Sequence, residues 1–238
     1  MKTVILCGGK GIRLRPYTED MPKSMMVVGD KPLIWHIMKI YSHYDFNEFI
    51  LALGYKGEKI VEWCKKNCPP EWKIDFVDTG EGGTGDRLVK IKDLIDGEDF
   101  FCTYGDGLSD VNLKELLKFH QDNGLIATIT VVRPQSNFGF VEMDENGQII
   151  YFVEKPPMEK YVNGGFFVFK KIFFEYLKKM GEDGMMEKRP FEFLAKDSQM
   201  MGYKHEGFWK CMDTYADLIK LNELWSNDAK WKVWDKKS

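Results

Sequence analysis

Near its start the sequence reads Thr3-Val4-Ile5-Leu6-Cys7, then Gly8-Gly9-Lys10-Gly11-Ile12-Arg13-Leu14-Arg15-Pro16, and a little later Pro22-Lys23-Ser24-Met25. An apolar run that ends in glycines predicts a buried parallel strand whose carboxyl end turns sharply and approaches a ligand closely. Open α/β sheets bind their ligands at this edge. Backbone N–H groups in such a loop form an anion-binding concavity, to which Arg13 and Lys23 add two cations. The stretch therefore predicts a phosphate-binding loop.

Two known phosphate-binding motifs do not fit this loop. A dinucleotide fingerprint needs a third glycine where Leu14 stands, and the sequence contains no Gly-x-x-x-x-Gly-Lys-Ser/Thr run for a P-loop. The remaining alternative is an ordinary glycine-rich turn with two solvated basic residues. The spacing favours the phosphate loop over that alternative.

Length and composition limit the class of protein. The chain has 238 residues, of which 44% are hydrophobic and 14% aromatic, so it can bury a well-packed core. We expect one domain. The formal net charge of −3 provides no basic field for a polynucleotide, so nucleic acid is not an expected partner.

The cysteines and the apolar runs indicate the compartment. The five cysteines are odd in number, and Cys64 and Cys68 lie one helical turn apart without further ligands at zinc spacing. We therefore expect reduced thiols and no zinc. No basic-then-apolar signal pattern opens the sequence, and no apolar run approaches the roughly eighteen residues of a membrane span. These observations predict a cytoplasmic protein that does not contact a membrane.

Strand-like and helix-like segments alternate along the chain. Strands are expected over 3–7, 49–53, 74–77, 100–103, 126–132, 166–169 and 200–204, with a hairpin over 139–143 and 148–153. Helices are expected over 31–41, 58–66, 87–95, 113–120, 172–179, 190–196 and 214–225. This order predicts a Rossmann-like α/β fold with a mixed, mainly parallel sheet flanked by helices. The tail over 228–238 carries Trp231 and Trp234, which either pack back on the body or contact a partner.

Two aspartates follow apolar runs and are candidates for a cation site. Asp106 lies between Gly105 and Gly107, where a carboxylate at the ligand edge of the sheet suits a hard cation. Because Asp-Gly is also a common turn pair, the alternative is a turn aspartate bonded to its own backbone. Asp213, taken alone, suits the N-cap of the last helix.

Several motifs together resemble the sugar-1-phosphate nucleotidyltransferases. The opening Gly-Gly-x-Gly-x-Arg-Leu-x-Pro with Pro-Lys-x-Met matches the signature of that family. The likeness extends along nearly the whole chain and is closest to the glucose-1-phosphate cytidylyltransferases. The further matching segments lie at 33–38, 54–57, 77–80, 104–107, 154–156, 163–168 and 205–214.

This resemblance implies a reaction, a cofactor and an architecture. It implies that a nucleotidyl group passes from a nucleoside triphosphate, CTP, to a sugar 1-phosphate, glucose 1-phosphate, with Mg²⁺ as cofactor. It also implies a homo-oligomer and a single nucleotidyltransferase domain of GT-A-like fold over residues 1–238. Within that domain it implies a nucleotide-binding part over about 1–110 and a sugar-phosphate-binding part over about 111–225.

The resemblance also assigns residues to the site. The positions it implies for nucleotide binding are Leu6, Gly8, Gly9, Gly11, Ile12, Arg13, Lys23, Thr84, Gly85, Arg87, Tyr104 and Gly105, of which Arg13 and Lys23 are also catalytic. Those it implies for the sugar phosphate are Glu154, Lys155, Asn163, Gly164 and Trp209, and those for the metal are Asp106 and Asp213.

Four features depart from the family pattern. Ile12 stands where threonine is usual, Ser24 where proline is common, and Asp86 where the family has glycine, while the segment 67–72 is shorter than its counterpart. Asp86 either faces solvent at the start of a helix or points into the base pocket.

Three alternative functions remain. One is the same reaction with UTP, dTTP, GTP or another acceptor phosphate. A glycosyltransferase of related architecture also uses an acid-bound metal, but the opening motif argues against it. A nucleotide-sugar sensor without turnover is disfavoured because Lys23, Asp106 and Asp213 occur together.

Overall fold

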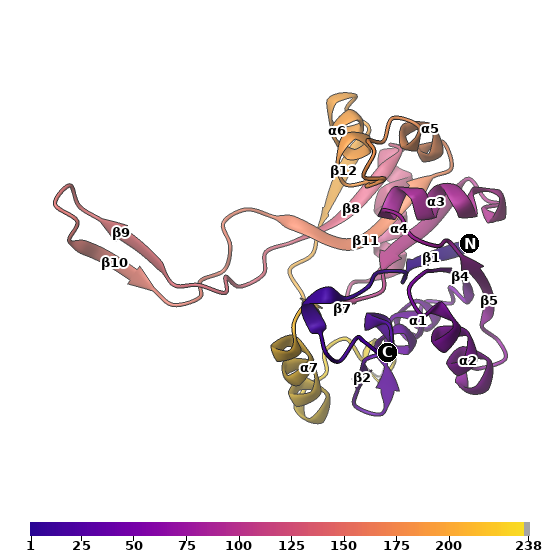
Figure 1. The fold of residues 1–238 in the computed structure, drawn as a ribbon. Coiled ribbons are helices and arrows are strands. Elements are labelled where there is room, and N and C mark those ends of the chain that lie inside the picture. The colour runs from indigo at the N-terminus through magenta and orange to yellow at the C-terminus, as the bar shows by residue number, and fades with distance from the viewer. Residues whose placement is uncertain (236–238) are drawn as a thin grey trace.

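A seven-stranded mixed sheet forms the centre of the molecule, which a computed structural model describes over residues 1–235 (Figure 1). Its strands, in spatial order, are β12 (Met200–Lys204), β8 (Ala127–Val132), β11 (Val162–Lys170), β6 (Asp99–Tyr104), β1 (Lys2–Leu6), β4 (Glu48–Leu53) and β5 (Lys73–Asp78). Strand β11 runs antiparallel to β6 and β8, whereas the other neighbours pair in parallel. The predicted mixed, mainly parallel sheet is confirmed.

Helices cover both faces of this sheet. Along β1, Ile5 joins one buried cluster while Val4 and Leu6 join the other, because successive side chains of a strand point to opposite faces. The first cluster packs against α1 (Leu33–His43), α2 (Gly57–Asn67) and α4 (Leu113–Asn123). The second packs against α3 (Thr84–Ile91), α5 (Phe173–Leu177) and α6 (Arg189–Lys196). The result is a three-layer α/β/α body.

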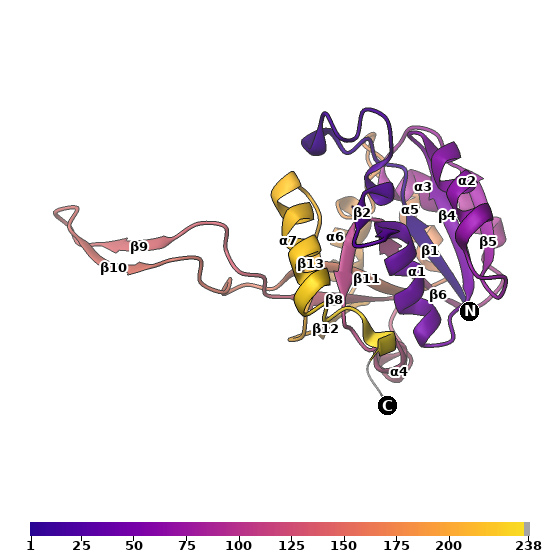
Figure 2. The ribbon, with the colours of Figure 1, turned by 90° about the horizontal axis from the view of Figure 1, so that it is seen from below.

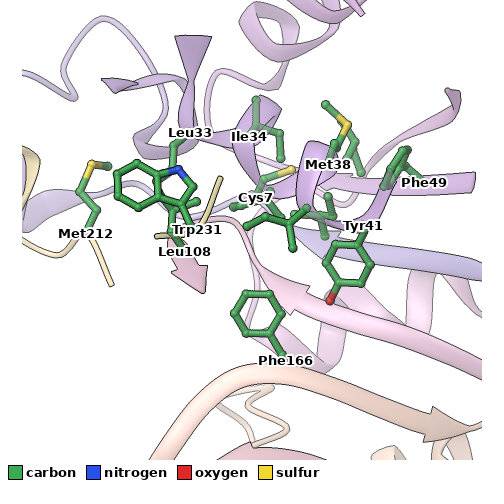
Figure 3. Packing of buried hydrophobic residues seen from close by; sticks show 14 of the residues in the cluster. Cys7, Leu33, Ile34, Met38, Tyr41, Phe49, Leu108, Phe166, Met212 and Trp231 are labelled. Atoms are coloured by element: carbon green, nitrogen blue, oxygen red, sulfur yellow. The ribbon is translucent and has the colours of Figure 1, made fainter. Parts of the chain in front are cut away.

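The carboxyl-terminal tail packs back on this body. After α7 (Tyr215–Asn227) the chain crosses to α1, where the indole of Trp231 is fully buried. Figure 3 shows this indole beside Leu33 and Leu108, with Met212 nearby. Of the two alternatives for the tail, the described residues therefore show packing on the body; the tail's last residues, 236–238, lie outside them.

Two short strand pairs lie at the ligand edge of the sheet, and the sequence pattern did not reveal them. Strand β7 (Gly107–Ser109) pairs antiparallel with β13 (Trp209–Cys211), and the Met212 N–H donates to the Asp106 carbonyl at 2.9 Å. A second pair joins β2 (Val27–Val28) to β3 (Lys31–Pro32). The first pair brings Asp106 and Asp213 together across more than a hundred residues of sequence.

The predicted hairpin is confirmed, and it projects far from the body. Strands β9 (Phe140–Met143) and β10 (Ile149–Val153) form it, and Figures 1 and 2 both show it reaching away from the sheet. A bridge between Gln135 and Pro157 closes its base. We call residues 136–156 the arm. Its exposed large apolar side chains are Phe138, Phe140, Val141, Met143, Ile149, Ile150, Tyr151 and Phe152.

Several boundaries differ from the sequence prediction; for example, the helix expected over 31–41 spans 33–43 and the strand expected over 166–169 spans 162–170. The helix expected over 87–95 begins at Thr84, because the Asp86 carboxylate and the Gly184 carbonyl accept hydrogen bonds from its first turn. The N-cap of α7 is Thr214, not Asp213, since the Thr214 hydroxyl accepts from the Asp217 N–H at 3.3 Å. Within residues 1–235 no helix is both long and apolar enough to cross a membrane.

Candidate active site

The glycine loop after β1 forms one wall of a small cavity. The Gly105 N–H donates to the Leu6 carbonyl at 3.0 Å, so the ends of β1 and β6 lie side by side. Gly11 turns the chain with a φ of 59°, a conformation that glycine adopts without steric cost, and Leu14 anchors the following turn in the core. The cavity measures about 80 Å³ and is lined by Leu6, Cys7, Gly9, Lys23, Ser24, Gly105 and Asp106.

Four charged side chains meet at the mouth of this cavity. The Lys23 ammonium lies 2.7 Å from a carboxylate oxygen of Asp106 and 2.7 Å from one of Asp213. The Arg13 guanidinium donates to the same Asp213 oxygen at 2.9 Å. Burial alone would lower the pKa of Lys23, but the Asp106 charge and the hydrogen bonds to both carboxylates outweigh it and raise the pKa above its ordinary value. Lys23 is therefore a charged ammonium shared by two acids.

This arrangement fits a divalent cation. Asp106 and Asp213 come from the two sides of the β7–β13 pair and direct oxygen atoms at one point. The Lys23 ammonium already occupies the space between them, so the pair demonstrably holds positive charge. Carboxylate oxygens are the ligands that hard divalent cations prefer. The Asp106 carboxylate thus pairs with the ammonium of Lys23, which is distant in the sequence. A turn aspartate would instead bond to its own backbone.

A chain of hydrogen bonds links the two predicted halves of the site. The hydroxyls of Thr84 and Tyr104 donate to the two oxygens of Glu187, at 2.5 and 2.6 Å. The Asn163 amide donates in turn to the Tyr104 hydroxyl at 3.1 Å. Burial, and next the Glu187 charge, raise the pKa of Tyr104 well above its ordinary value, so its hydroxyl stays protonated. Glu187 thereby joins Thr84, predicted to bind the nucleotide, to Asn163, predicted to bind the sugar phosphate.

Arg87 is buried beneath the loops. Its guanidinium donates to the carbonyls of Leu53, Gly80 and Gly8 at 3.0, 3.0 and 3.1 Å, and to the Thr79 hydroxyl at 2.6 Å. A side chain at position 8 would overlap this guanidinium. Arg87 therefore holds the glycine loop after β1 against the loop that follows β5.

Asp86 caps α3. Its carboxylate accepts from the Gly83 N–H at 3.0 Å, and the Gly184 carbonyl accepts from the N–H groups of Gly85 and Asp86 at 2.8 and 3.1 Å. Of the two alternatives for Asp86, the structure therefore shows the helix-terminal one. Ile12, the other departure in the loop, is 63% exposed.

The remaining predicted sugar-phosphate residues fall into two groups. The Trp209 indole donates to the Gly164 carbonyl at 2.7 Å, which ties β13 to β11 beside the site. Glu154 and Lys155 lie at the return of the arm, where their side chains are 61% and 58% exposed and pair with each other at 3.7 Å. Within residues 1–235 neither hydrogen-bonds to another predicted site residue.

Sequence reasoning missed two side chains at this site. Glu187 lies in an irregular segment before α6, where neither periodicity nor a motif distinguishes it. Cys211 has a ligand atom within 4.8 Å of those of Asp106 and Asp213. Only the alternation of Cys211 and Asp213 about the buried Met212 indicates in the sequence that they share a face.

Comparisons with known sequences agree on one family. The family model described as "Nucleotidyl transferase" matches residues 2–227. The chain is 44% identical to "Probable glucose-1-phosphate cytidylyltransferase" of Bacillus subtilis, with 98% of this chain and all of that protein covered. It is 36% identical to "Glucose-1-phosphate cytidylyltransferase" of Salmonella typhi, with 99% and 100% covered.

Comparison with solved structures supports the fold. A putative glucose-1-phosphate thymidylyltransferase from Bacillus anthracis matches with a TM-score of 0.78 at 20% identity, covering 100% of this chain and 97% of that one. HddC from Yersinia pseudotuberculosis, solved with GMP-PN, matches with a TM-score of 0.73 at 24% identity, covering 94% and 99%.

Proposed function

Because the chain belongs to the nucleotidyl transferase family, we propose that it transfers the cytidylyl group of CTP to glucose 1-phosphate and releases pyrophosphate. The observation that carries the proposal is the meeting of Arg13 and Lys23 with Asp106 and Asp213 beside a glycine loop. The names of the two relatives at 44% and 36% identity support glucose 1-phosphate and CTP as the substrates.

The reaction needs charge neutralisation more than a base. A phosphate oxygen of the sugar 1-phosphate attacks the α-phosphorus, the bond to the β-phosphate oxygen breaks, and pyrophosphate leaves with that electron pair. The nucleophile has a second pKa of about 6 and is largely a dianion near neutral pH, so it needs no general base. Two unit charges 4 Å apart repel by roughly 4 kcal/mol at an effective dielectric near 20, so cations decide the rate.

The chain supplies these cations from its loops. We assign Arg13 to the departing pyrophosphate and Lys23 to phosphates near the reacting centre. Lys155 is assigned to the sugar phosphate, with Glu154, Asn163, Gly164 and Trp209 around the sugar. Lys23 has to leave the two carboxylates to reach a phosphate, and its flexible stem permits that movement.

Nucleotidyltransferases of this family generally use a divalent metal ion. We propose Mg²⁺, held by Asp106 and Asp213, which when bound supplies positive charge at the α-phosphate. With a metal ion held by the two carboxylates, the Lys23 ammonium would be released from them and would be free to contact the phosphates.

The two halves of the sheet support one domain in which each half binds a different substrate. We propose that residues of about 1–110 bind the nucleotide, through the glycine loop, Thr84, Gly85, Tyr104 and Gly105. Residues of about 111–225 bind the sugar phosphate. Arg87 is assigned to this nucleotide part through the loops that it holds beside the base.

Pyrophosphate release tests the reaction class. CTP and glucose 1-phosphate together should yield one pyrophosphate per nucleotide sugar, and neither alone should do so. Release of a nucleoside diphosphate from a nucleotide sugar would identify a glycosyltransferase, and substrate binding without turnover would identify a sensor. UTP, dTTP and GTP with other sugar phosphates complete the panel.

Asp106→Asn tests the acid pair within that assay. It keeps the shape but loses the charge that holds the cation, so metal-dependent turnover should vanish. The matched control is Asp144→Asn in the arm's turn, where the amide oxygen can still accept from Asn146 and Gln148. Identical metal titration curves for Asp106→Asn and the unmodified chain would remove Asp106 from the site.

We also propose that the chain self-associates through the arm. We place the protein in the cytoplasm as a further part of this proposal. Eight large apolar side chains of the arm are exposed, whereas a monomer rarely leaves more than a few hundred Å² of contiguous apolar surface uncovered. An isolated two-stranded hairpin is marginally stable in water, so the arm gains most from a second copy that covers it. The five free cysteines support a reducing compartment.

A further inference from the structure

Cys211 faces the same point as the two metal-binding aspartates. Within residues 1–235 its sulfur and one oxygen each from Asp106 and Asp213 all lie within 4.8 Å of one another. Two features of the backbone produce this approach. Cys211 lies opposite Gly107 in the β7–β13 ladder, next to Asp106, and it shares a strand face with Asp213 because Met212 between them points into the core.

A thiolate changes which metal such a site prefers. Two carboxylates alone suit Mg²⁺ and Mn²⁺, whereas a sulfur ligand favours Zn²⁺ and other thiophilic ions. Zinc accepts both cysteine sulfur and carboxylate oxygen as ligands. Cys211 is half-buried, and Asp106 beside it lines the cavity.

We propose that Asp106, Cys211 and Asp213 form a mixed oxygen–sulfur site that takes a thiophilic divalent ion, Zn²⁺ or Cd²⁺, in the nucleotide-free protein. The inference rests on the proposed role of the acid pair as a cation site. On binding, the thiol proton passes to solvent, a metal–sulfur bond forms, and the Lys23 ammonium leaves the space between the two carboxylates. The site proposed for Mg²⁺ in the reaction would thereby also bind Zn²⁺ or Cd²⁺, and either ion would exclude Mg²⁺ while it is bound.

The test is a Cd²⁺ titration of the nucleotide-free full chain, followed by the ultraviolet charge-transfer band of the cadmium–thiolate bond and by calorimetry. Cys64 and Cys68 lie one turn apart on α2 and offer a competing thiol pair, so the starting variant is Cys64→Ala/Cys68→Ala. We expect one Cd²⁺ per chain with the thiolate band.

Cys211→Ser in that background should abolish the band and weaken Cd²⁺ binding by on the order of tenfold or more, since even partners beyond the direct ligands are worth 10- to 100-fold. Mn²⁺ affinity, measured by electron paramagnetic resonance, should change much less because Mn²⁺ gains little from sulfur. Asp106→Asn should also weaken Cd²⁺ binding, because it removes one ligand charge from the same site.

Three outcomes would overturn the inference: a thiolate band that survives Cys211→Ser, Cd²⁺ affinity indifferent to Cys211→Ser, or Cd²⁺ affinity indifferent to Asp106→Asn. Failure here and failure of the proposed function are separable. Pyrophosphate release with Mg²⁺ reports on the function in the unmodified chain, whereas Cd²⁺ binding needs neither substrate.

Discussion

Lys23 balances the charge of the two aspartates in the substrate-free site, and we propose that it contacts phosphates during the reaction. Its ammonium is shared by Asp106 and Asp213 at 2.7 Å each. We expect Lys23→Ala to lower kcat about 100-fold or more, since one lost phosphate contact in a preorganised site is worth a few kcal/mol. Turnover by pyrophosphate release is the measurement, and circular dichroism checks that the loop change leaves the fold intact.

The control for Lys23 is a lysine in an ion pair remote from the cavity. Lys114 pairs with Asp45 at 2.9 Å on the surface, and such pairs contribute little to stability, so Lys114→Ala should turn over normally. A folded Lys23→Ala variant with near-normal turnover would take Lys23 out of the mechanism.

We propose that Glu187 is a positioning residue where the two proposed substrate subsites meet. Gln keeps the shape but replaces a charged acceptor with a neutral one, and hydrogen bonds to charged groups are worth about 1.5 to 3 kcal/mol. We expect Glu187→Gln to lower kcat/KM for CTP about tenfold and Glu187→Ala to lower it further. Kinetics with each substrate varied separately is the measurement.

The KM values for the two substrates distinguish a positioning role of Glu187 from a general loss of fold stability. Because Glu187 orients Thr84 directly and Asn163 through Tyr104, KM for both substrates should rise together. A Glu187→Gln variant with unchanged KM values but a lower unfolding temperature would mean that Glu187 only stabilises the fold.

At the scale of elements, local pattern predicted most of the fold. The strand at β1 and helix α1 follow from apolar runs and 3.6-residue periodicity, which depend on neighbours in sequence. Strands β7 and β13 have only three residues each and form because distant segments meet, so periodicity cannot detect them. By residue type both Asp213 and Thr214 suit the N-cap, and the reciprocal hydrogen bonds with Asp217 select Thr214.

The site was predictable to a similar extent. The glycine loop and Asp106 carry a physical signal in their own surroundings, a strand end beside glycines. Glu187 carries none, because its role arises from a contact with Thr84, 103 residues away in the sequence. For Cys211 the only signal is its alternation with Asp213 about Met212, because its place beside Asp106 depends on the β7–β13 ladder. The resemblance supplied Asp213, for which local reasoning preferred a helix cap.

Docking of the tail on α1 should make stability depend on pH. His36 Nε2 donates to the Val28 carbonyl at 2.9 Å, and the Trp231 indole N–H donates to Nδ1 at 3.4 Å, an arrangement that requires the neutral ring. Burial lowers the pKa of His36 to about 4, against its ordinary 6.5. The unfolded chain therefore binds more protons between these values, and stability is lost as pH falls from about 6.5 towards 4.

Urea unfolding at pH 7 and pH 5 measures this effect. The unmodified chain should lose about 2 kcal/mol more of its unfolding free energy over this range than His36→Gln, which cannot titrate. His43→Gln, at an exposed histidine of the same helix whose pKa is also lowered by partial burial and by the Lys39 charge, should remove less of the pH dependence than His36→Gln. Equal slopes for the unmodified chain and His36→Gln would contradict the buried neutral ring.

At the scale of the whole molecule, the arm projects from the body and exposes apolar side chains that the body does not cover. We expect the unmodified chain to sediment as an oligomer and Ile150→Asp to shift it towards the monomer, because a buried charge without a partner opposes association. Ile150 is 63% exposed, so the substitution leaves the packing of the body intact. Sedimentation equilibrium at several concentrations is the measurement.

Ile172→Asp is the matched control for the arm. Ile172 is 55% exposed and lies on the body, outside the arm, so the assembly should persist. A monomeric unmodified chain, or an Ile150→Asp variant that assembles like the unmodified one, would contradict association through the arm.

Nucleotide choice tests the central claim most directly. Cytosine differs from uracil by its exocyclic amino donor, and a site with an acceptor for that group rejects the analogue that lacks it. With glucose 1-phosphate saturating, we expect kcat/KM for CTP to exceed that for UTP, dTTP and GTP by about tenfold or more, the effect of one hydrogen bond of about 1.4 kcal/mol. Asp86→Gly should keep this order because Asp86 caps α3. A kcat/KM for UTP or dTTP above that for CTP in the unmodified chain would contradict the cytidylyl assignment.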